Sequence, residues 1–398
     1  MTASEKVVIS GAGPVGLSAA VALVNAGIPC VVLEKRESLS TASKASTFHP
    51  PTLEIFDEFG IIDPILAKGV RVDSIQYRRA SGDVVADFDL ELLSPHTRFP
   101  FRLHLEQSEI TPLLIERLEA SGLAEIRFGV EVVDAGEDDG AAWVKIKTAD
   151  GSTETIEADY LLAADGARST IRDTLGIDLK GSSYPGQVLR LIVTEDMQAY
   201  LPGLAYISYI FAENGKSISL LKMPDCWRVI IRLEEGCDGE AAARPEWYMP
   251  VVRSFIPNVP DRLAVRSYDI YEARKMVAER AGQGRINLIG DALHLTNTRG
   301  GMNMNCGIHD AYQVASAIAA AVAAAKPEIA SAATAERLRI AAEDLIPRTD
   351  RNVAGGADWL AEISKVAADR TTAAAYLESS AMLDIAPRPQ GGRLAQSL

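Results

Sequence analysis

A glycine-rich segment near the N-terminus constrains the fold more than any other feature of this sequence. Residues 11–16 read Gly-Ala-Gly-Pro-Val-Gly, which fits the pattern GxGxxG. An apolar strand is expected before it at residues 7–10, a helix at residues 14–26, and a second strand at residues 30–33. This order predicts a βαβ unit, with which a parallel sheet begins.

Each glycine of the pattern has a separate physical role. Gly11 permits the tight turn, Gly13 lets the backbone approach a pyrophosphate, and Gly16 allows the helix to pack closely on the strand. Glu34 ends the second strand 18 residues beyond Gly16, where a carboxylate can accept hydrogen bonds from ribose hydroxyls. The segment therefore predicts a dinucleotide site.

The rest of the chain favours an α/β fold with an inserted β-rich part. Between residues 181 and 267, short apolar runs separated by Gly, Asp and Pro predict an antiparallel sheet. An apolar strand and an Ala-rich helix follow, so the first domain resumes there. Further strands are expected at residues 141–148, 155–157, 160–164, 188–193, 206–211, 217–222, 227–233 and 285–289, and further helices at residues 51–59, 108–121, 169–175 and 308–325.

Composition and charge exclude several classes of protein. The 398 residues are 47% hydrophobic and 24% charged, which excludes a disordered or fibrous chain. The net charge of −14 gives no basic surface for phosphates, so we expect no nucleic-acid partner. Residues 7–24 are interrupted by glycines and residues 314–325 are too short to span a bilayer, so we expect no membrane segment.

Cysteines and histidines are scattered along the chain. The four cysteines form no CxxC pair and no disulfide framework, and the five histidines are isolated from them and from one another. We therefore expect reduced thiols in a cytoplasmic protein, and no metal site. The sequence does not fix the assembly, and a homodimer is kept as one option.

The chain holds a single GxGxxG segment. This argues against the reductases that have two separate nucleotide-binding domains. The segment alone does not separate FAD from NAD, and other parts of the chain must decide.

Taken in order, several segments resemble the group A flavoprotein monooxygenases, the single-component aromatic hydroxylases related to p-hydroxybenzoate hydroxylase. Residues 165–172 (DGARSTIR) resemble the DG motif of that family, and residues 284–285 and 290–294 (GR and GDALH) resemble its GD motif. Residues 300–311 (GGMNMNCGIHDA) resemble the flavin loop and the helix start that follow it. Weaker likenesses lie at residues 44–54 and 107–111.

The resemblance implies a Rossmann-like FAD-binding domain with an inserted antiparallel β-sheet substrate domain and C-terminal helices. Residues 1–73, 102–182 and 270–350 would form the discontinuous FAD-binding domain. Residues 74–101 and 183–269 would form the substrate domain, and residues 351–398 the C-terminal helices and tail.

The resemblance also implies how FAD would be held. Asp291 would accept hydrogen bonds from the ribityl hydroxyls, the backbone amides of Met304 and Asn305 would face the flavin N1 and O2, and Gln107 would bind the flavin chain or the pyrophosphate. Lys44 stands where the family commonly has Arg, so it would offer a point charge instead of a fork. The full cofactor-binding set is Gly11, Gly13, Pro14, Val15, Gly16, Glu34, Lys35, Arg36, Lys44, Ala45, Gln107, Asp165, Gly166, Gly290, Asp291, Gly300, Gly301, Met302, Asn303, Met304 and Asn305.

Asp165 and Arg172 admit two interpretations. They would help to hold FAD and the nicotinamide donor, or they would form a local ion pair that ties a loop to a helix.

The sequence departs from the family pattern beside the expected flavin ring. The family often has Pro-Pro facing the substrate, whereas this chain has Asn297 and Thr298. Asn303 stands where the family often has glycine, and Asn tolerates positive φ, so we expect the loop to keep its shape. His294 is either a polar group near the flavin or a packing residue. The catalytic candidates are thus His294, Asn297 and Thr298.

The activity that the resemblance implies is aromatic hydroxylation. NADH or NADPH reduces FAD, O2 adds at the flavin C4a position, and the resulting hydroperoxide transfers oxygen to a small aromatic or heteroaromatic ring. Strand alternation in the inserted sheet nominates four substrate contacts: Arg190, Tyr206, Tyr209 and Ser219.

Two other hypotheses about the function stay open. One is a flavoprotein oxidoreductase that inserts no oxygen, and the other is a flavin-binding protein without turnover. A flavin halogenase is disfavoured because the chain lacks a WxWxIP segment.

Overall fold

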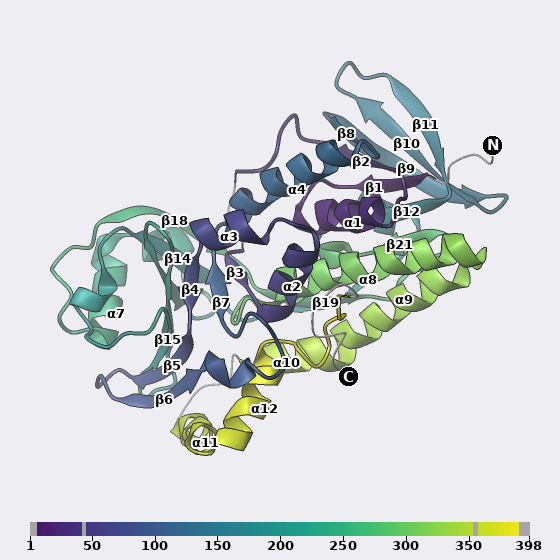
Figure 1. The fold of residues 1–398 in the computed structure, drawn as a ribbon. Helices are drawn as coiled ribbons and strands as arrows, with labels where there is room; N and C mark the ends of the chain where they lie inside the picture. The colour runs from purple at the N-terminus through teal and green to yellow at the C-terminus, as the bar shows by residue number, and fades with distance from the viewer. Residues whose placement is uncertain (1–5, 42–44, 353–356, 390–398) are drawn as a thin grey trace.

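The glycine motif lies in a six-stranded sheet whose central strands are parallel (Figure 1). The structure is a computed structural model that describes residues 6–41, 45–352 and 357–389. The strand order is β20-β21-β12-β1-β2-β8, and β20 is antiparallel to β21. The bounds are β1 Val7–Ser10, β2 Cys30–Glu34, β8 Ala124–Phe128, β12 Tyr160–Ala163, β20 Gly282–Gln283 and β21 Ile286–Leu288. Because β1 lies between β2 and β12, the glycine turn is at the centre of the carboxyl edge.

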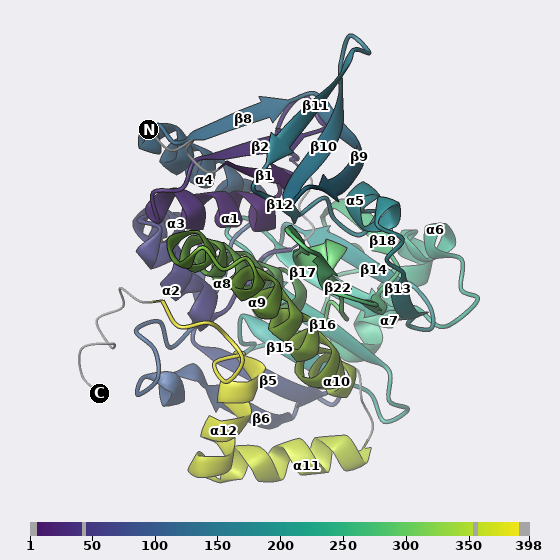
Figure 2. The same ribbon diagram turned by 90° about the vertical axis from the view of Figure 1, so that its right-hand side faces the viewer.

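Alternation along the buried strands divides the core on the two faces of this sheet. Val7 and Ile9 point into a core shared with several helices, α1, α4 and α8 among them, whereas Val8 points into a core shared with an antiparallel ribbon. Figure 2 shows the helices α1 and α8 below the parallel strands and the ribbon above them. The helices are α1 Pro14–Asn25, α4 Gln107–Ser121 and α8 Met302–Ala324, and the ribbon is β9 Val130–Asp138, β10 Ala141–Thr148 and β11 Thr153–Ala158.

A second, seven-stranded sheet is built from two separate parts of the chain (Figure 1). Its order is β18-β14-β17-β16-β15-β5-β6, and β15 pairs with β5 in parallel. One face is apolar, with Leu191 and Val229 packed in the core that includes helix α7. The opposite face carries Tyr77, Tyr209 and Ser219 in one row across three strands. The bounds are β5 Ser74–Arg79, β6 Val84–Asp89, β14 Val188–Val193, β15 Ile207–Phe211, β16 Ser217–Lys222, β17 Trp227–Arg232, β18 Val265–Tyr271 and α7 Pro245–Phe255.

Two small sheets connect these parts. One has the order β3-β7-β4 and the other β13-β19-β22. Figure 1 places β3, β4 and β7 between the seven-stranded sheet and the helical layer. The bounds are β3 Thr47–Phe48, β4 Val70–Val72, β7 Arg102–His104, β13 Leu179–Ser183, β19 Arg274–Ala278 and β22 His294–Leu295.

The C-terminal helices cover the seven-stranded sheet. Leu360 of α11 and Leu377 of α12 pack in one core with Phe88 and Phe211 of that sheet. None of the helices in the described ranges combines the length and apolar composition needed to cross a membrane. The remaining helices are α2 Pro50–Glu58, α3 Ile62–Lys68, α5 Thr170–Thr174, α6 Gly239–Ala242, α9 Glu328–Arg339, a π-helix Ile340–Leu345, α10 Ile346–Arg351, α11 Ala357–Ala368 and α12 Arg370–Ser380; short 3-10 turns lie at Leu90–Leu93, Met197–Ala199 and Gly290–Ala292.

The structure confirms the α/β fold class and most of the expected elements. The strands expected at residues 141–148, 188–193 and 217–222 have those bounds. The helix expected from residue 308 is longer, because it begins at Met302 directly after the turn at Gly301. The domain boundaries given above stay a prediction.

Removal of the side chain of Leu377 tests how strongly the C-terminal helices are held. Leu377 is fully buried, so Leu377→Ala should lower the free energy of unfolding by about 2–5 kcal/mol. Chemical denaturation measures this change. The control is Val84→Ala, in strand β6 of the sheet that α12 covers. Val84 is 49% exposed, so its truncation should change stability by less than about 0.5 kcal/mol. Equal losses for the two variants would contradict the packing described here.

Candidate cofactor site and active-site cavity

The turn after β1 leaves room above Gly13. A Cβ at Gly11, where φ is +108°, would lie 2.4 Å from the carbonyl oxygen of Ala164, and a Cβ at Gly16 would lie 2.0 Å from that of Gly11. A Cβ at Gly13 would meet no atom within 4 Å. Gly11 and Gly16 are thus required by the fold, whereas Gly13 faces open space beside the uncapped N-terminus of α1. This arrangement fits a pyrophosphate.

Glu34 is held beside the same turn. Its Oε2 accepts a hydrogen bond from the Ala12 amide at 3.0 Å, and its Oε1 accepts one from the Arg36 amide at 3.0 Å. The guanidinium of Arg36 pairs with Oε1 at 3.3 Å, while Lys35 is exposed. The carboxylate is therefore fixed at the end of β2, next to the pyrophosphate position, which fits the expected ribose contact.

Three residues bring α1, α8 and the turn after β21 into close contact. A Cβ at Gly307 of α8 would lie 2.9 Å from the Val15 side chain and 3.1 Å from the Cα of Gly290. A Cβ at Gly290, where φ is +60°, would lie 3.0 Å from Val15. Small residues at these two positions let the first turns of α8 approach the glycine turn of β1.

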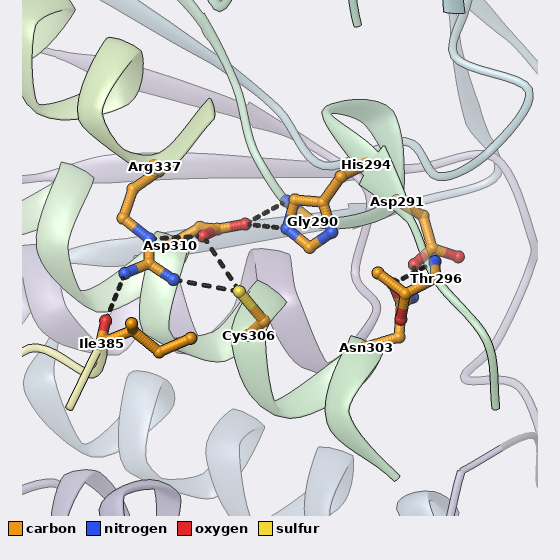
Figure 3. A network of polar contacts seen from close by, with 9 residues as sticks. All are labelled: Gly290, Asp291, His294, Thr296, Asn303, Cys306, Asp310, Arg337 and Ile385. Carbon is orange, nitrogen blue, oxygen red and sulfur yellow. Dashed lines mark hydrogen bonds and ion pairs between the residues drawn. The ribbon is translucent and has the colours of Figure 1, made fainter. Parts of the chain in front are cut away.

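Asn303 connects the Gly290–Asp291 turn to α8. Its Nδ2 donates a hydrogen bond to Asp291 Oδ1 at 2.8 Å, and its Oδ1 accepts one from the Thr296 amide at 3.0 Å. Figure 3 shows these three residues together at one end of the polar network. Asp291 is half-buried, so a carboxylate edge can still reach a ligand hydroxyl.

The expectation that Asn303 adopts positive φ in place of a glycine is wrong. Asn303 is helical, in the first turn of α8, and the left-handed backbone belongs to Gly300 and Gly301, with φ of +94° and +68°. The side chain of Asn303, rather than its backbone, is what the site uses. No side chain caps α8, so the amides of its first turn, which include Met304, are available to an anion.

The rest of the expected cofactor set lies near these turns. The Gln107 amide at the start of α4 donates to the Ala45 carbonyl at 3.2 Å. The Asn305 side chain donates to the carbonyls of Thr47 and Gly301 at 2.8 and 2.6 Å and accepts from the His49 amide. Lys44 lies outside the described residues.

Asp165 and Arg172 form no ion pair with each other in the described ranges. Asp165 Oδ2 accepts from the Ile171 amide at 3.3 Å, while its Oδ1 is buried without a partner. Burial raises the pKa of this carboxyl. Arg172 instead donates to the carbonyls of Ala167 and Ala292 at 3.1 and 3.3 Å. The unpartnered Oδ1 beside Gly166 leaves an acceptor for a ligand, whereas Arg172 holds the turn.

His294 belongs to a buried ionic network behind the Gly290 turn (Figure 3). His294 Nε2 lies 2.8 Å from Asp310 Oδ2, which also accepts from the Gly290 amide at 3.1 Å. Arg337 donates to Asp310 Oδ1 at 2.7 Å and to Cys306 Sγ at 3.0 Å. His294 does not line the cavity described below. The geometry therefore favours a positioning role for His294.

His294, Cys306 and Asp310 could geometrically hold a metal ion, because their ligand atoms lie within 4.8 Å of one another. Sequence spacing gave no sign of this cluster. The guanidinium of Arg337 donates to two of the three groups, Asp310 and Cys306, so the protein's own cation already contacts this cluster. Arg337 also donates to the Ile385 carbonyl at 2.9 Å, which ties the C-terminal segment to the network.

A cavity lies between the seven-stranded sheet and the loop before α8. It encloses about 350 Å³ of non-atom space, part of which is open solvent. The sheet contributes Tyr209, the loop contributes Gly300, and α8 contributes its first residue, Met302. The remaining lining residues are Ile75, Tyr77, Arg102, Phe211, Arg299, Asn352, Tyr376 and Ser380. A water-sized sphere reaches about 20 Å³ of that space, so the walls must move apart to admit an aromatic ring.

Only one of the four nominated substrate residues, Tyr209, lines this cavity. Ser219 neighbours Tyr209 across the sheet, and Arg190 on the same face is paired with Asp269 at 2.7 Å. Tyr206 packs against Trp227 with ring centroids 6.1 Å apart, away from the lining. The contact role of Arg190, Tyr206 and Ser219 stays a prediction.

Sequence reasoning missed most of the cavity wall. Tyr77 and Tyr376, far apart in the chain, join their hydroxyls at 2.6 Å. Arg102 is the one residue of the Lys, Arg, Asp and Glu types in the otherwise mostly apolar run at positions 99–105, a signal that could have been noticed. Tyr376 and Ser380 lie on α12, for which the sequence offered no functional pattern.

The two residues that replace the Pro-Pro pair lie beside the loop. Asn297 is fully buried; its Oδ1 accepts from the Arg299 amide at 2.8 Å, and its Nδ2 has no partner in the described ranges. Thr298 is exposed, with its hydroxyl 3.3 Å from that of Tyr271. Asn297 thus shapes the loop before Gly300, and a catalytic role for either residue stays a prediction.

Gly13→Ala separates cofactor binding from folding. The new methyl group meets nothing in the protein, so the unfolding temperature without FAD should stay within about 2 °C of the wild type. Affinity for FAD should fall at least about tenfold, because the methyl group occupies the space expected for the pyrophosphate. Fluorescence titration with FAD measures this. Gly16→Ala is the comparison, since its Cβ would overlap the Gly11 carbonyl and prevent folding. Unchanged FAD affinity of Gly13→Ala would place the cofactor elsewhere.

The network around Asp310 should make stability depend on pH. Burial lowers the pKa of His294, but Asp310 and Cys306 outweigh it and raise that pKa well above 6.5. Burial raises the pKa of Asp310, but His294 and Arg337 hold it at about 2. The His294 contribution is fully present below pH about 6.5 and is lost as the pH rises through the raised value. The Asp310 contribution is lost as the pH falls below about 4.

His294→Asn tests this dependence through thermal unfolding between pH 4 and 10. The variant should be less stable by about 3–5 kcal/mol at pH 6, with a flatter profile above pH 6.5. His309→Asn is the matched control on α8, because burial holds the pKa of His309 at about 3 and it is neutral throughout. If the stability of both variants falls above pH 6.5 as steeply as that of the wild type, His294 is not charged in the folded protein.

Comparison with known proteins agrees with this geometry. Residues 4–346 match the family described as FAD binding domain. The chain is 31% identical over 339 residues to para-nitrophenol 4-monooxygenase of Pseudomonas sp. (strain WBC-3), across 81% of this chain and 79% of that protein. It is 29% identical over 361 residues to 6-hydroxy-3-succinoylpyridine 3-monooxygenase of Pseudomonas putida (strain DSM 28022 / S16), across 89% of each.

The fold is also similar to a solved structure. The crystal structure of p-nitrophenol 4-monooxygenase from Pseudomonas putida DLL-E4 aligns with a TM-score of 0.87 and 25% identity, covering 97% of this chain and all of that one. With the glycine turn, Glu34 and Asp291 arranged to receive a dinucleotide, FAD is the cofactor. The chain belongs to the FAD binding domain family and, within it, to the group A flavin-dependent aromatic hydroxylases, which are FAD-dependent monooxygenases.

Proposed function

We propose that this monooxygenase uses NADH or NADPH and O2 to hydroxylate a small phenolic or hydroxylated heteroaromatic ring in the cavity beside Tyr209. One observation carries the proposal: Gly300 and Met302, at the start of α8, line the same cavity as Tyr77 and Tyr209. The family resemblance implies that the flavin ring lies against this loop. The relatives described above support the substrate class, since their names specify a nitrophenol and a hydroxypyridine.

The residues present fit the chemistry that such a reaction needs. When bound, FAD takes electrons from the nicotinamide and activates O2. The first-turn amides of α8, which include Met304, place positive partial charge where the loop meets the cavity, and so stabilise negative charge there. The walls of Tyr209, Phe211 and Ile75 are buried, which keeps water from a reactive group.

Tyr77 and Tyr376 would orient a phenolic oxygen. Burial raises the pKa of Tyr77 well above 10 and also raises that of Tyr376. Both hydroxyls therefore stay protonated at neutral pH, and the 2.6 Å bond between them leaves one free to donate to a ring oxygen. The pair lies at the wall of the cavity formed by the sheet and α12.

A second function without oxygen insertion is favoured by one feature. Buried Asn297 and exposed Thr298 stand where the family often has two prolines facing the substrate. A different backbone beside the ring could favour oxidation of the substrate without oxygen transfer.

We also propose a cytoplasmic location. All four cysteines are free, and Cys30, Cys226 and Cys306 are buried, which suits a reducing compartment. The assembly is left open, with a homodimer as one option.

Oxygen-18 incorporation tests the proposed function. The FAD-reconstituted protein is given NADH or NADPH under 18O2 with a panel of phenols, hydroxybenzoates and hydroxypyridines. We expect one ring class to stimulate nicotinamide oxidation at least about tenfold and to gain one 18O atom per product molecule. Stimulation without 18O would support the non-oxygenating function. Tight FAD binding with no stimulation across the panel would support a protein without turnover.

A further inference from the structure

The cavity contains two guanidinium groups without a carboxylate partner in the described residues. Arg102 is 2% exposed; one Nη donates to the Ser380 carbonyl at 3.0 Å, while its Nε has no hydrogen-bond partner. Arg299 donates to the Asn352 carbonyl at 3.1 Å and to the Ser217 hydroxyl at 2.6 Å. Both line the cavity and come from different elements, since Arg102 belongs to β7 and Arg299 to the loop before α8.

Two other buried arginines, both of the seven-stranded sheet, have counter-ions. Arg190 pairs with Asp269 at 2.7 Å, and Arg228 pairs with Glu106 at 2.5 Å. A buried guanidinium without an anion is costly, because desolvation is not repaid by a Coulombic partner. The fold thus supplies carboxylates for Arg190 and Arg228, whereas no described carboxylate pairs with the two arginines inside the cavity.

The remaining groups around these arginines are aromatic rings and hydroxyls. The guanidinium of Arg299 lies over the rings of Tyr209 and Phe211, at 5.5 and 5.6 Å from their centroids. Burial and the nearby Arg232 lower the pKa of Arg299 to about 10, so it is still charged at neutral pH. The cavity therefore offers flat apolar walls, hydrogen-bond donors and positive charge together.

We propose that the cavity is selective for aromatic anions, and that Arg102 and Arg299 bind a planar two-oxygen group of the substrate, a carboxylate or the nitro group of a phenolate. This inference rests on the proposed function, because it assigns the substrate class of that site. A guanidinium fork matches two coplanar oxygens, and the bound anion supplies the charge that the fold omits. A neutral analogue leaves both charges without an anion, Arg102 buried and Arg299 half-buried, so it binds less tightly.

Matched ligand pairs test this selectivity without turnover. The pairs are 4-hydroxybenzoate with 4-hydroxybenzamide, and ionised 4-nitrophenol with 4-nitroaniline, which is neutral at the same pH. Binding to the FAD-reconstituted protein is followed by the change in flavin absorbance. In at least one pair the anion should bind about 10-fold to 100-fold more tightly than its neutral partner. Equal affinities in both pairs, or no binding of either anion, would overturn the inference.

Two independent variants identify the groups responsible. Arg102→Met and Arg299→Met should each reduce the preference for the anion at least about tenfold, while the affinity for the neutral partner changes by less than about threefold. Compared with Arg102→Met, Arg102→Lys should restore part of the preference for the anion. Arg78→Met is the matched control, since Arg78 is a buried arginine of β5 bonded to Gln76 and Gly82, adjacent in sequence to Tyr77 and so on the other face.

The outcomes separate this inference from the proposed function. An anion preference that both cavity variants retain, or that Arg78→Met also removes, would overturn the assignment of Arg102 and Arg299. A preference that depends on them, with no 18O in any product, would leave the anion site standing and overturn only the hydroxylation.

Discussion

The close contact between Val15, Gly290 and Gly307 is the constraint on which the rest of the site depends. It allows the first turns of α8 to lie against the glycine turn of β1 with no side chain between them. Asp310 then accepts a hydrogen bond from the Gly290 amide and fixes the turn from behind. Because the glycine turn of β1 and the Gly290 turn pack on α8, and the cavity loop leads into α8, this packing contact sets the distance between the cofactor turns and the cavity. A larger residue at Gly290 or Gly307 would therefore move both.

Sequence patterns predicted the parts of the fold that depend on neighbouring residues. Alternation located the strands of the inserted sheet, and the glycine motif located the first turn, because both signals lie within about ten residues. The use of Asn303 could not be predicted in this way, since its partners Asp291 and Thr296 lie on another element. The cavity wall could not be predicted either, because Tyr77 meets Tyr376 only when the C-terminal helices pack on the sheet. The sequence therefore predicts local secondary structure, whereas contacts between residues distant in the chain become visible only in the folded structure.

Buried charge is distributed unevenly in this protein. The network of His294, Asp310 and Arg337 brings cations and a carboxylate together behind the cofactor turn, where they hold elements in place. In the cavity, Arg102 and Arg299 have only neutral acceptors. Charge that is paired internally contributes to rigidity, whereas charge that is left unpaired favours a ligand of opposite sign. The contrast distinguishes residues that maintain the fold from residues that select what binds.

The C-terminal segment connects the cavity to the buried network of His294, Asp310 and Arg337. The family match ends at residue 346, whereas Tyr376 and Ser380, which complete the cavity, lie on α12 beyond it. The same segment contributes the Ile385 carbonyl that accepts from Arg337 of the buried network. The part of the chain that matches the family model thus carries the cofactor turns, and α12, beyond that match, completes the wall of the cavity. Because α12 contributes side chains to the cavity wall, whereas the glycine turn and Glu34 lie on β1 and β2, a change in α12 can alter what the cavity binds while those cofactor contacts stay intact.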